Sequence, residues 1–259
     1  MSGRLSEIIG VMMSVILLFA GCEKSYMDDE NEASSGLDPN TVSVPSGFEA
    51  DAFEVTGGLN VWTKAKKLTF DCVVTFYKPD GSYYLTEQQY DIEPWSDAIE
   101  ISGHEPEGEY AWKFSDGTMS VIQGIGQDRK LFSDLASSCF AQAILTITTA
   151  PIRLLDPSTQ FDKQDSAIRI QGQWYYPIKK SGERPNEAVF YQNRDSLMID
   201  IIQLRCPGTN KSIAVRGYDY QKIEKDGIFV PSKIEIFTTG AEEVLQRRIV
   251  KIDCQTIRL

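Results

Sequence analysis

Alternating hydrophobic and polar residues, separated by short turn sequences, constrain the fold of this chain more than any other feature. Every second residue in the segment 68–76 is apolar, from Leu68 to Phe76. Further along, Tyr110, Trp112 and Phe114 also alternate with other residues. A period of two residues is typical of a strand with one buried face. The tight-turn sequence Asp116-Gly117 follows directly, so the pattern predicts neighbouring antiparallel strands joined in chain order.

The predicted strands fall into two blocks on either side of a helical segment. The first block covers residues 68–76, 83–92, 98–102, 109–115 and 118–123, and the second covers residues 168–178, 188–192, 197–204, 212–222, 228–236 and 245–256. Between the blocks, Arg129–Ala150 carries apolar residues such as Leu135 at helical spacing. A shorter helical segment around residues 50–65, interrupted at Gly57-Gly58, precedes the first block.

Roughly ten antiparallel strands joined by short turns predict a strongly curved sheet or an unclosed half-barrel. Such a sheet has a concave apolar face, and we expect the helix in Arg129–Ala150 to cover it as a lid. A large barrel of this kind need not be filled by side chains and can hold an apolar ligand. The predicted fold class is therefore mainly β with helices (α+β), with residues 48–259 as one domain.

The first 22 residues indicate the cellular compartment. An apolar run from Ile8 to Ala20 follows Arg4, and it is shorter than the roughly 20 residues that a bilayer span needs. The sequence Leu18-Phe19-Ala20-Gly21-Cys22 resembles a bacterial lipobox, which implies cleavage before Cys22 and acyl chains on that residue. Several acyl chains on one residue give stable anchoring. A short membrane anchor, or an ordinary signal with a chance cysteine, is the alternative.

These features divide the N-terminal region into a signal peptide, residues 1–21, and a tether, residues 22–47. The tether is polar and acidic, so we expect it to be flexible. Glu23 rather than Asp follows Cys22. In the known sorting rule Asp retains lipoproteins at the inner membrane, so a lipid-anchored position at the outer membrane, facing the periplasm, is favoured.

Charge and motif content exclude several classes of function. The chain has 26 basic and 37 acidic residues, a net charge of −11, which argues against nucleic acid as a partner because phosphate binding needs clustered Lys and Arg. The single histidine, His104, lies in a predicted turn, and we expect it to be solvated. No metal site, cofactor or enzymatic activity is predicted. A hydrolase with a site scattered along the chain is a further hypothesis.

Four cysteines remain once Cys22 carries lipid: Cys72, Cys139, Cys206 and Cys254. Disulfides are favoured in an oxidising compartment, and four cysteines allow three pairings. A bridge between Cys206 and Cys254 is favoured because both lie in the second strand block. Cys72 and Cys139 lie on apolar faces, where a free cysteine acts as a small hydrophobic residue.

A late segment resembles a known family. Gly227–Ile236 reads Gly-Ile-Phe-Val-Pro-Ser-Lys-Ile-Glu-Ile. Together with the order of signal, early helix, strand block, central helix and second strand block, it resembles the lipoprotein-carrier superfamily. The best-known members of that superfamily sort outer-membrane lipoproteins through the periplasm. The resemblance covers residues 48–259 in layout and is specific over about ten of them. It implies an unclosed half-barrel with a helical lid that binds acyl chains or other lipids.

Aromatic and aliphatic residues on the predicted inner face are the candidate ligand-binding residues. They would line an apolar cavity, and the same residue types would equally form an ordinary core: Phe70, Phe76, Tyr110, Trp112, Phe114, Leu135, Trp174 and Tyr176. The predicted function is that of a membrane-anchored envelope lipoprotein that binds a lipid or an acylated ligand non-covalently, in lipoprotein or lipid transfer. The alternative is a structural or assembly accessory protein that contacts an envelope protein partner.

Overall fold

The computed structural model describes residues 36–42, 45–105, 108–124, 135–156, 159–180, 188–223, 227–240 and 243–259. The chain from Ser34 onward forms one compact unit. The predicted signal peptide, Cys22 and residues 22–35 of the expected tether lie outside the described residues. Leu37 and Val42, near the end of that expected tether, pack against the hydrophobic core. None of the helices in the described ranges is long and apolar enough to cross a membrane.

Short helices precede each of two strand blocks. The first block follows α1 (Phe48–Glu54) and α2 (Leu59–Trp62), and its strands are β1 (Leu68–Tyr77), β2 (Tyr83–Glu93), β3 (Ala98–Glu105), β4 (Gly108–Ser115) and β5 (Thr118–Gln123). The helices α3 (Ser137–Thr148) and α4 (Ala150–Arg153) come next. The second block contains β6 (Phe161–Lys163), β7 (Ile168–Ile170), β8 (Gln173–Lys180), β9 (Ala188–Asn193), β10 (Ile199–Arg205), β11 (Ser212–Lys222), β12 (Phe229–Thr238) and β13 (Arg248–Arg258).

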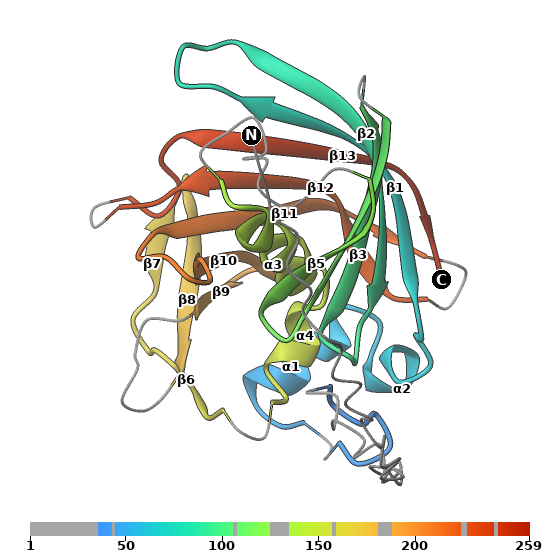
Figure 1. Cartoon of the computed structure of the whole chain (residues 1–259). Coiled ribbons are helices and arrows are strands. Elements are labelled where there is room, and N and C mark those ends of the chain that lie inside the picture. The colour runs from blue at the N-terminus through green and yellow to red at the C-terminus, as the bar shows by residue number, and fades with distance from the viewer. Residues whose placement is uncertain are drawn as a thin grey trace, which may run out of the picture. The chain divides into compact units, whose positions relative to one another are not determined.

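All of these strands form one antiparallel sheet that is open at both edges. The strand order is β5-β4-β3-β2-β1-β13-β12-β11-β10-β9-β8-β6, and β7 pairs with β8. Most strands therefore pair with their chain neighbours, whereas the β1–β13 pair joins the first block to the last strand. The sheet curves around α3, and its two edge strands do not pair with each other (Figure 1). The predicted fold, an unclosed and strongly curved antiparallel sheet, is confirmed.

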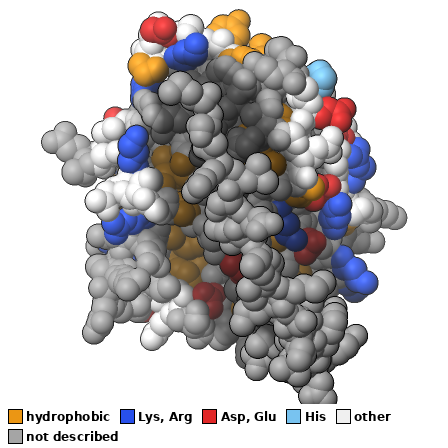
Figure 2. Space-filling model, in the orientation of Figure 1, with side chains coloured by type: hydrophobic (Ala, Val, Ile, Leu, Met, Phe, Trp, Pro, Cys, Tyr) orange, Lys and Arg blue, Asp and Glu red, His pale blue; other side chains and the backbone are white. Residues whose placement is uncertain are grey.

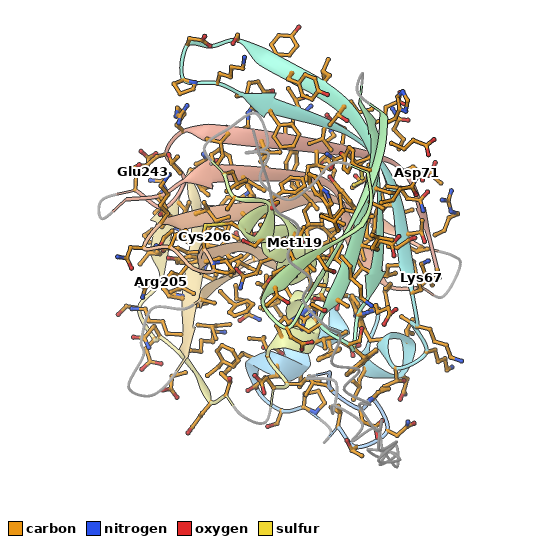
Figure 3. All side chains as sticks on the ribbon, in the orientation of Figure 1. Lys67, Asp71, Met119, Arg205, Cys206 and Glu243 are labelled. Atoms are coloured by element: carbon orange, nitrogen blue, oxygen red, sulfur yellow. A yellow bond between two sulfur atoms is a disulfide. The ribbon has the colours of Figure 1, made fainter. Side chains whose placement is uncertain are left out.

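Helix α3 fills the concave side of the sheet. Nine of its 12 residues are buried, and it contacts β3, β4 and β5 from one block and β10, β11 and β12 from the other. The ring of Phe140 lies 5.6 Å from that of Phe76 and 6.3 Å from that of Tyr90. Figure 3 shows side chains occupying the space between α3 and the sheet, with Met119 and Cys206 beside the helix. A helix buried on nearly all sides is a core element, so α3 covers the concave face, as predicted for the lid, and packs into it as a plug.

A tight hairpin explains why one predicted face is wrong. The sequence pattern places Ile168, Trp174 and Tyr176 on a single face of one strand, residues 168–178. The structure contains two strands, because Gln171 and Gly172 both have positive φ and reverse the chain. Ile168 then pairs with Tyr175 and shares its side of the sheet, so Trp174 and Tyr176 lie on the opposite side from Ile168. Trp174 remains 40% exposed.

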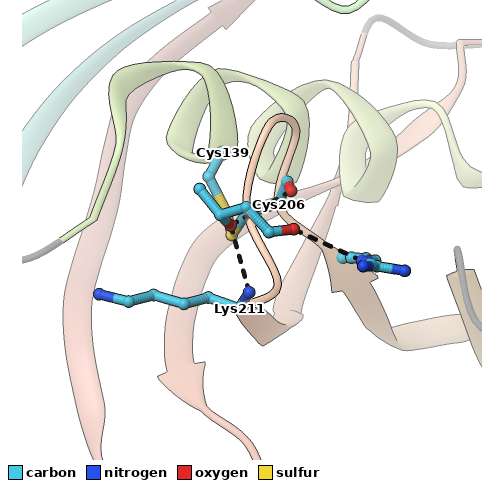
Figure 4. The surroundings of a disulfide bond; sticks show 5 residues. Cys139, Cys206 and Lys211 are labelled. Atoms are coloured by element: carbon cyan, nitrogen blue, oxygen red, sulfur yellow. Dashed lines mark hydrogen bonds between the residues drawn. A yellow bond between two sulfur atoms is a disulfide. The ribbon is translucent and has the colours of Figure 1, made fainter.

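A disulfide attaches α3 to the second strand block. Cys139, in the first turn of α3, is bonded to Cys206, which directly follows β10 (Figure 4). The predicted bridge between Cys206 and Cys254 is wrong. Strands β11 and β12 lie between β10 and β13 in the sheet, which separates those two cysteines, whereas α3 packs directly on β10. Cys139, expected to be a free buried residue, therefore links α3 covalently to the second strand block.

A largely buried carboxylate lies where the pairing of β10 is irregular. Asp200 lies at a register shift between Ile199 and Ile201, and its Oδ2 accepts a hydrogen bond from Asn193 Nδ2 at 3.4 Å. Burial raises the pKa of Asp200 to about 6, although the positive charge of Arg216 opposes the shift. A buried acid with a raised pKa costs stability wherever it is ionised.

Replacing this acid is expected to stabilise the protein at neutral pH. The pKa is about 6 in the folded state against 3.8 for the model group, so the folded state holds the proton more tightly. That contribution to stability is complete below about pH 4 and is lost as the pH rises through about 6. Asp200→Asn should therefore gain up to about 3 kcal/mol at pH 7 and flatten the pH dependence between those values. Urea unfolding across this range, with Asp195→Asn as an exposed control, measures both effects. A variant with unchanged pH dependence would contradict the assignment.

Candidate functional site

A cavity of about 430 Å³ lies beside the plug helix, between α3, α4 and the strands β4, β6, β9 and β10. Its volume falls within the range of about 300 to 1,000 Å³ that is common for small-molecule sites. Figure 2 shows hydrophobic side chains in a recess on this face, with acidic and basic side chains beside them. The lining residues divide into an apolar wall and a polar end, and each is described in turn.

The apolar wall comes from both strand blocks and from the segment before α1. It consists of Leu37, Phe114, Phe161, Ala188, Phe190 and Leu204. The rings of Phe161 and Phe190 meet edge to face with their centroids 5.5 Å apart. Ala188 pairs with Leu204 across β9 and β10, so their side chains share one face of the sheet. This wall provides a surface for the apolar part of a ligand.

The polar end is organised by Arg153 of α4. Its Nη1 lies 2.6 Å from Asp97 Oδ1, and its Nε donates a hydrogen bond of 2.9 Å to Thr149 Oγ1. Thr149 in turn donates to the carbonyl oxygen of Leu145, one turn back in the helical segment. Only 18% of the Arg153 side chain is exposed. The guanidinium is therefore held in place by two fixed contacts at the margin of the cavity.

The charges at this end are only partly compensated. Burial lowers the pKa of Arg153, and burial also raises the pKa of Asp97, so for both groups the loss of hydration outweighs their mutual attraction. Among the described residues, Arg153 Nη2 and Gln142 Oε1 are buried without a hydrogen-bond partner. The cavity margin thus carries one unsatisfied donor and one unsatisfied acceptor, and a ligand group with both functions would complement them.

The predicted ligand-binding residues separate into three groups. Those buried in the core around α3 are Phe70, Phe76, Tyr110, Trp112, Phe114 and Leu135. Of these, Phe114 lines the cavity beside α3. Tyr176 is partly buried under the Lys163 ammonium group, whose Nζ lies 4.5 Å from the ring centroid. Trp174 faces Arg194 and lines neither this cavity nor the two other hollows described below. The lipidation residue, Cys22, lies outside the described residues.

Sequence reasoning did not identify most of this cavity. Phe190 and Leu204 were recognised only as members of strands, because alternation does not show which residues face a helix and which face an empty space. Arg153 carried a usable signal: it is a single charge within the apolar run Ala150–Leu155. A charged residue in such a run is buried only when it is paired. Asp97, its partner, lies 56 positions earlier and has no local signal.

Two other hollows are more polar. One, of about 560 Å³, is formed mainly by the loop from Cys206 to Asn210. The other, of about 520 Å³, is lined mostly by acidic and amide side chains of the first strand block, together with Cys72 and Tyr110. Neither combines a buried aromatic wall with a buried charge. We therefore take the cavity beside α3, which does, as the candidate site.

Comparisons with known proteins support the fold. No protein-family model matches the sequence, and no curated protein matches it significantly. Among solved structures, a LolA superfamily protein from Nitrosomonas europaea has a TM-score of 0.51 at 12% sequence identity, covering 82% of this chain and 91% of that chain. At this identity the likeness shows the fold alone. It agrees with the predicted unclosed half-barrel fold.

Two further solved structures are more distant. A DUF1329 family protein from Desulfovibrio piger has a TM-score of 0.44 at 10% identity, covering 82% of this chain and 91% of its own. A candidate outer-membrane lipoprotein-sorting domain from Vibrio parahaemolyticus has a TM-score of 0.39 at 7% identity, covering 74% of this chain and 84% of its own.

The pairing of Arg153 with Asp97 is expected to be coupled energetically. Arg153→Gln removes the cation and leaves Asp97 without its partner, at a cost of roughly 2 kcal/mol in the free energy of unfolding. This figure lies below that for a fully buried pair because 39% of the Asp97 side chain is exposed. The double variant Arg153→Gln/Asp97→Asn should recover at least half of the loss. A double-mutant cycle from urea unfolding measures the coupling, and strictly additive losses would contradict it.

Proposed function

We propose that this chain is a lipid-anchored protein of the bacterial cell envelope that binds a lipid or an acylated ligand in the cavity beside α3. Binding is non-covalent, and no enzymatic step or cofactor is involved. The LolA-like half-barrel and the predicted lipobox at Cys22 support the proposal. The observation that carries it is the composition of the cavity, which combines an aromatic wall with a polar end.

The apolar wall favours a hydrocarbon chain. Each methylene group removed from water contributes about 0.8 kcal/mol, so a chain segment lying against Phe114, Phe161 and Phe190 gains several kcal/mol. Part of that gain offsets the loss of freedom on binding. The site therefore binds through the summed burial of an apolar tail rather than through one strong contact.

The polar end favours a head group that both donates and accepts hydrogen bonds. The unsatisfied Arg153 Nη2 needs an acceptor, and the unsatisfied Gln142 Oε1 needs a donor. Asp97 pairs with the Arg153 guanidinium, and the charge of Asp156 also acts on it, which disfavours a ligand with several negative charges. Amide-linked and hydroxyl-bearing acyl compounds match this arrangement best.

The position of α3 determines where such a ligand lies. Because α3 occupies the concave side of the sheet and is bonded to Cys206, the ligand binds along the flank of the helix. It contacts α3 through Gln142 and Thr146. The anchor at Cys22 would keep the domain near the outer membrane on its periplasmic side, where lipids and lipoproteins are the available ligands.

A second candidate function is that of an assembly accessory that contacts another envelope protein. Large hydrophobic side chains are exposed on the β1–β2 hairpin, where Tyr83 is 63% and Leu85 52% exposed. Ile122, on the edge strand β5, is 53% exposed. Exposed apolar side chains near a sheet edge favour protein contacts, and the binding experiment below distinguishes the two functions.

Introducing a charge into the apolar wall is expected to abolish ligand binding. Phe161→Asp places a carboxylate beside the bound chain and should weaken binding at least about tenfold. The measurement is displacement of a fluorescent fatty acid from the full chain carrying Cys22→Ser, with Trp174→Asp as a matched control on an exposed aromatic residue. Circular dichroism establishes that both variants fold. If the unsubstituted protein binds no probe, or if both variants bind equally, the cavity is not the site and the accessory function is favoured.

The anchor is tested separately in cells. Cys22→Ala should eliminate incorporation of an alkyne-labelled fatty acid and release the protein from the membrane fraction, because position 22 then has no thiol to carry the acyl chain. Cys254→Ala should leave both properties unchanged. Labelling that persists in Cys22→Ala would overturn the lipobox assignment without affecting the cavity.

A further inference from the structure

Two free cysteines face each other where the two strand blocks join. Within the β1–β13 pair, which we call the seam, Cys72 lies opposite Cys254 in the register. Their Sγ atoms are 3.2 Å apart, although the residues are separated by 182 positions in the sequence. Cys72 and Cys254 are both in the thiol form, whereas the other two described cysteines are bonded to each other. This juxtaposition is unused by the proposed ligand site.

The backbone at the seam suits a covalent bond between these sulfurs. Directly opposed residues of antiparallel strands have Cα atoms about 4.5 to 5.5 Å apart. Disulfides span Cα separations of about 4.4 to 6.8 Å. The side chains already point toward each other, so a small rotation about each Cα–Cβ bond brings the sulfurs from contact to bonding distance.

We propose that Cys72 and Cys254 are a second disulfide site, a redox-sensitive clasp that joins the two strand blocks covalently at the seam. The proposal rests on the register and the sulfur contact, and it does not depend on what the cavity binds. In an oxidising compartment, with Cys22 carrying lipid, all four remaining cysteines would then be paired.

The clasp forms by thiol–disulfide exchange with an external disulfide, which is the oxidant. Cys254 is only partly buried, whereas Cys72 is 4% exposed, so Cys254 as thiolate attacks first. That step forms a mixed disulfide and releases one thiol of the oxidant. Cys72 then loses its proton and attacks the Cys254 sulfur, and the second half of the oxidant leaves as a thiol. Two electrons and two protons pass from the cysteines to the oxidant.

The surroundings make the second step the slower one. Before oxidation, the hydrogen-bonded Cys254 thiol and then burial raise the pKa of the Cys72 thiol, and the acidic neighbours Asp71 and Asp253 act in the same direction. Burial and the two acidic neighbours remain when Cys254 has become a mixed disulfide. A thiol with a raised pKa is a poor nucleophile near neutral pH. The clasp should therefore close slowly and faster at higher pH. In the reverse direction, a reducing thiol attacks the disulfide at the sulfur of Cys254, which is the more exposed of the two.

The test treats the full-length chain carrying Cys22→Ser, otherwise unsubstituted, with hydroxyethyl disulfide, a small neutral oxidant, and analyses it by mass spectrometry without reduction. The unsubstituted protein should lose the mass of two hydrogen atoms, and a digest should contain the Cys72 and Cys254 peptides linked. Its thermal midpoint should rise by roughly 5 °C or more. Cys72→Ser should retain a stable hydroxyethyl adduct on Cys254, whereas Cys254→Ser should gain no adduct on Cys72.

The same experiment identifies the results that would overturn the clasp. A folded protein that keeps both thiols alkylatable after oxidation, while Cys139 remains bonded to Cys206, excludes it. A persistent adduct on Cys254 in the unsubstituted protein excludes it too, because Cys72 would then fail to attack. If either serine variant fails to fold, Cys72→Ala and Cys254→Ala replace it, and the linked peptide from the unsubstituted chain still decides.

Discussion

Burial of α3 against the concave side of an open sheet is the interaction on which the rest of the structure depends. A curved sheet whose edges do not pair leaves a large apolar surface that only another element can remove from water. Helix α3 performs this role for both strand blocks, since it packs on β3 to β5 and on β10 to β12. The two blocks share this helix and the seam between β1 and β13, and the Cys139–Cys206 disulfide fixes one end of the helix in place.

The candidate site follows from this arrangement. A helix packed against the concave side of a curved sheet leaves space along its flank. Here that space lies between α3, α4 and the inner faces of β4, β9 and β10. The helical segment continues past Thr149 into α4, which carries Arg153 to the margin of that space. The need to cover the concave apolar face of the sheet thus also produces a cavity with an apolar wall and a polar end. The same packing argues against a wide hollow running through the domain.

Local patterns predicted the fold well because they report short-range structure. The strand alternation from Leu68 to Phe76 and the turn at Asp116-Gly117 correspond directly to β1 and to the β4–β5 hairpin. Long-range relations were harder to predict. The Cys139–Cys206 bond depends on which strand the helix contacts, and the contact of Arg153 with Asp97 joins residues with no shared local pattern. The sequence pattern treats residues 168–178 as one strand, and the chain reversal at Gln171-Gly172 changes the side of Ile168 relative to Trp174.

Whether a ligand occupies the flank of α3 can be observed most directly by photo-crosslinking. A fatty acid with a photoreactive group near the end of its chain would be bound to the full chain, irradiated and located by peptide mass spectrometry. The account predicts crosslinks in the peptides that contain Phe114, Phe190 and Leu204, and their loss when excess unlabelled fatty acid competes. Crosslinks confined to the exposed β1–β2 hairpin, or insensitive to competition, would contradict it.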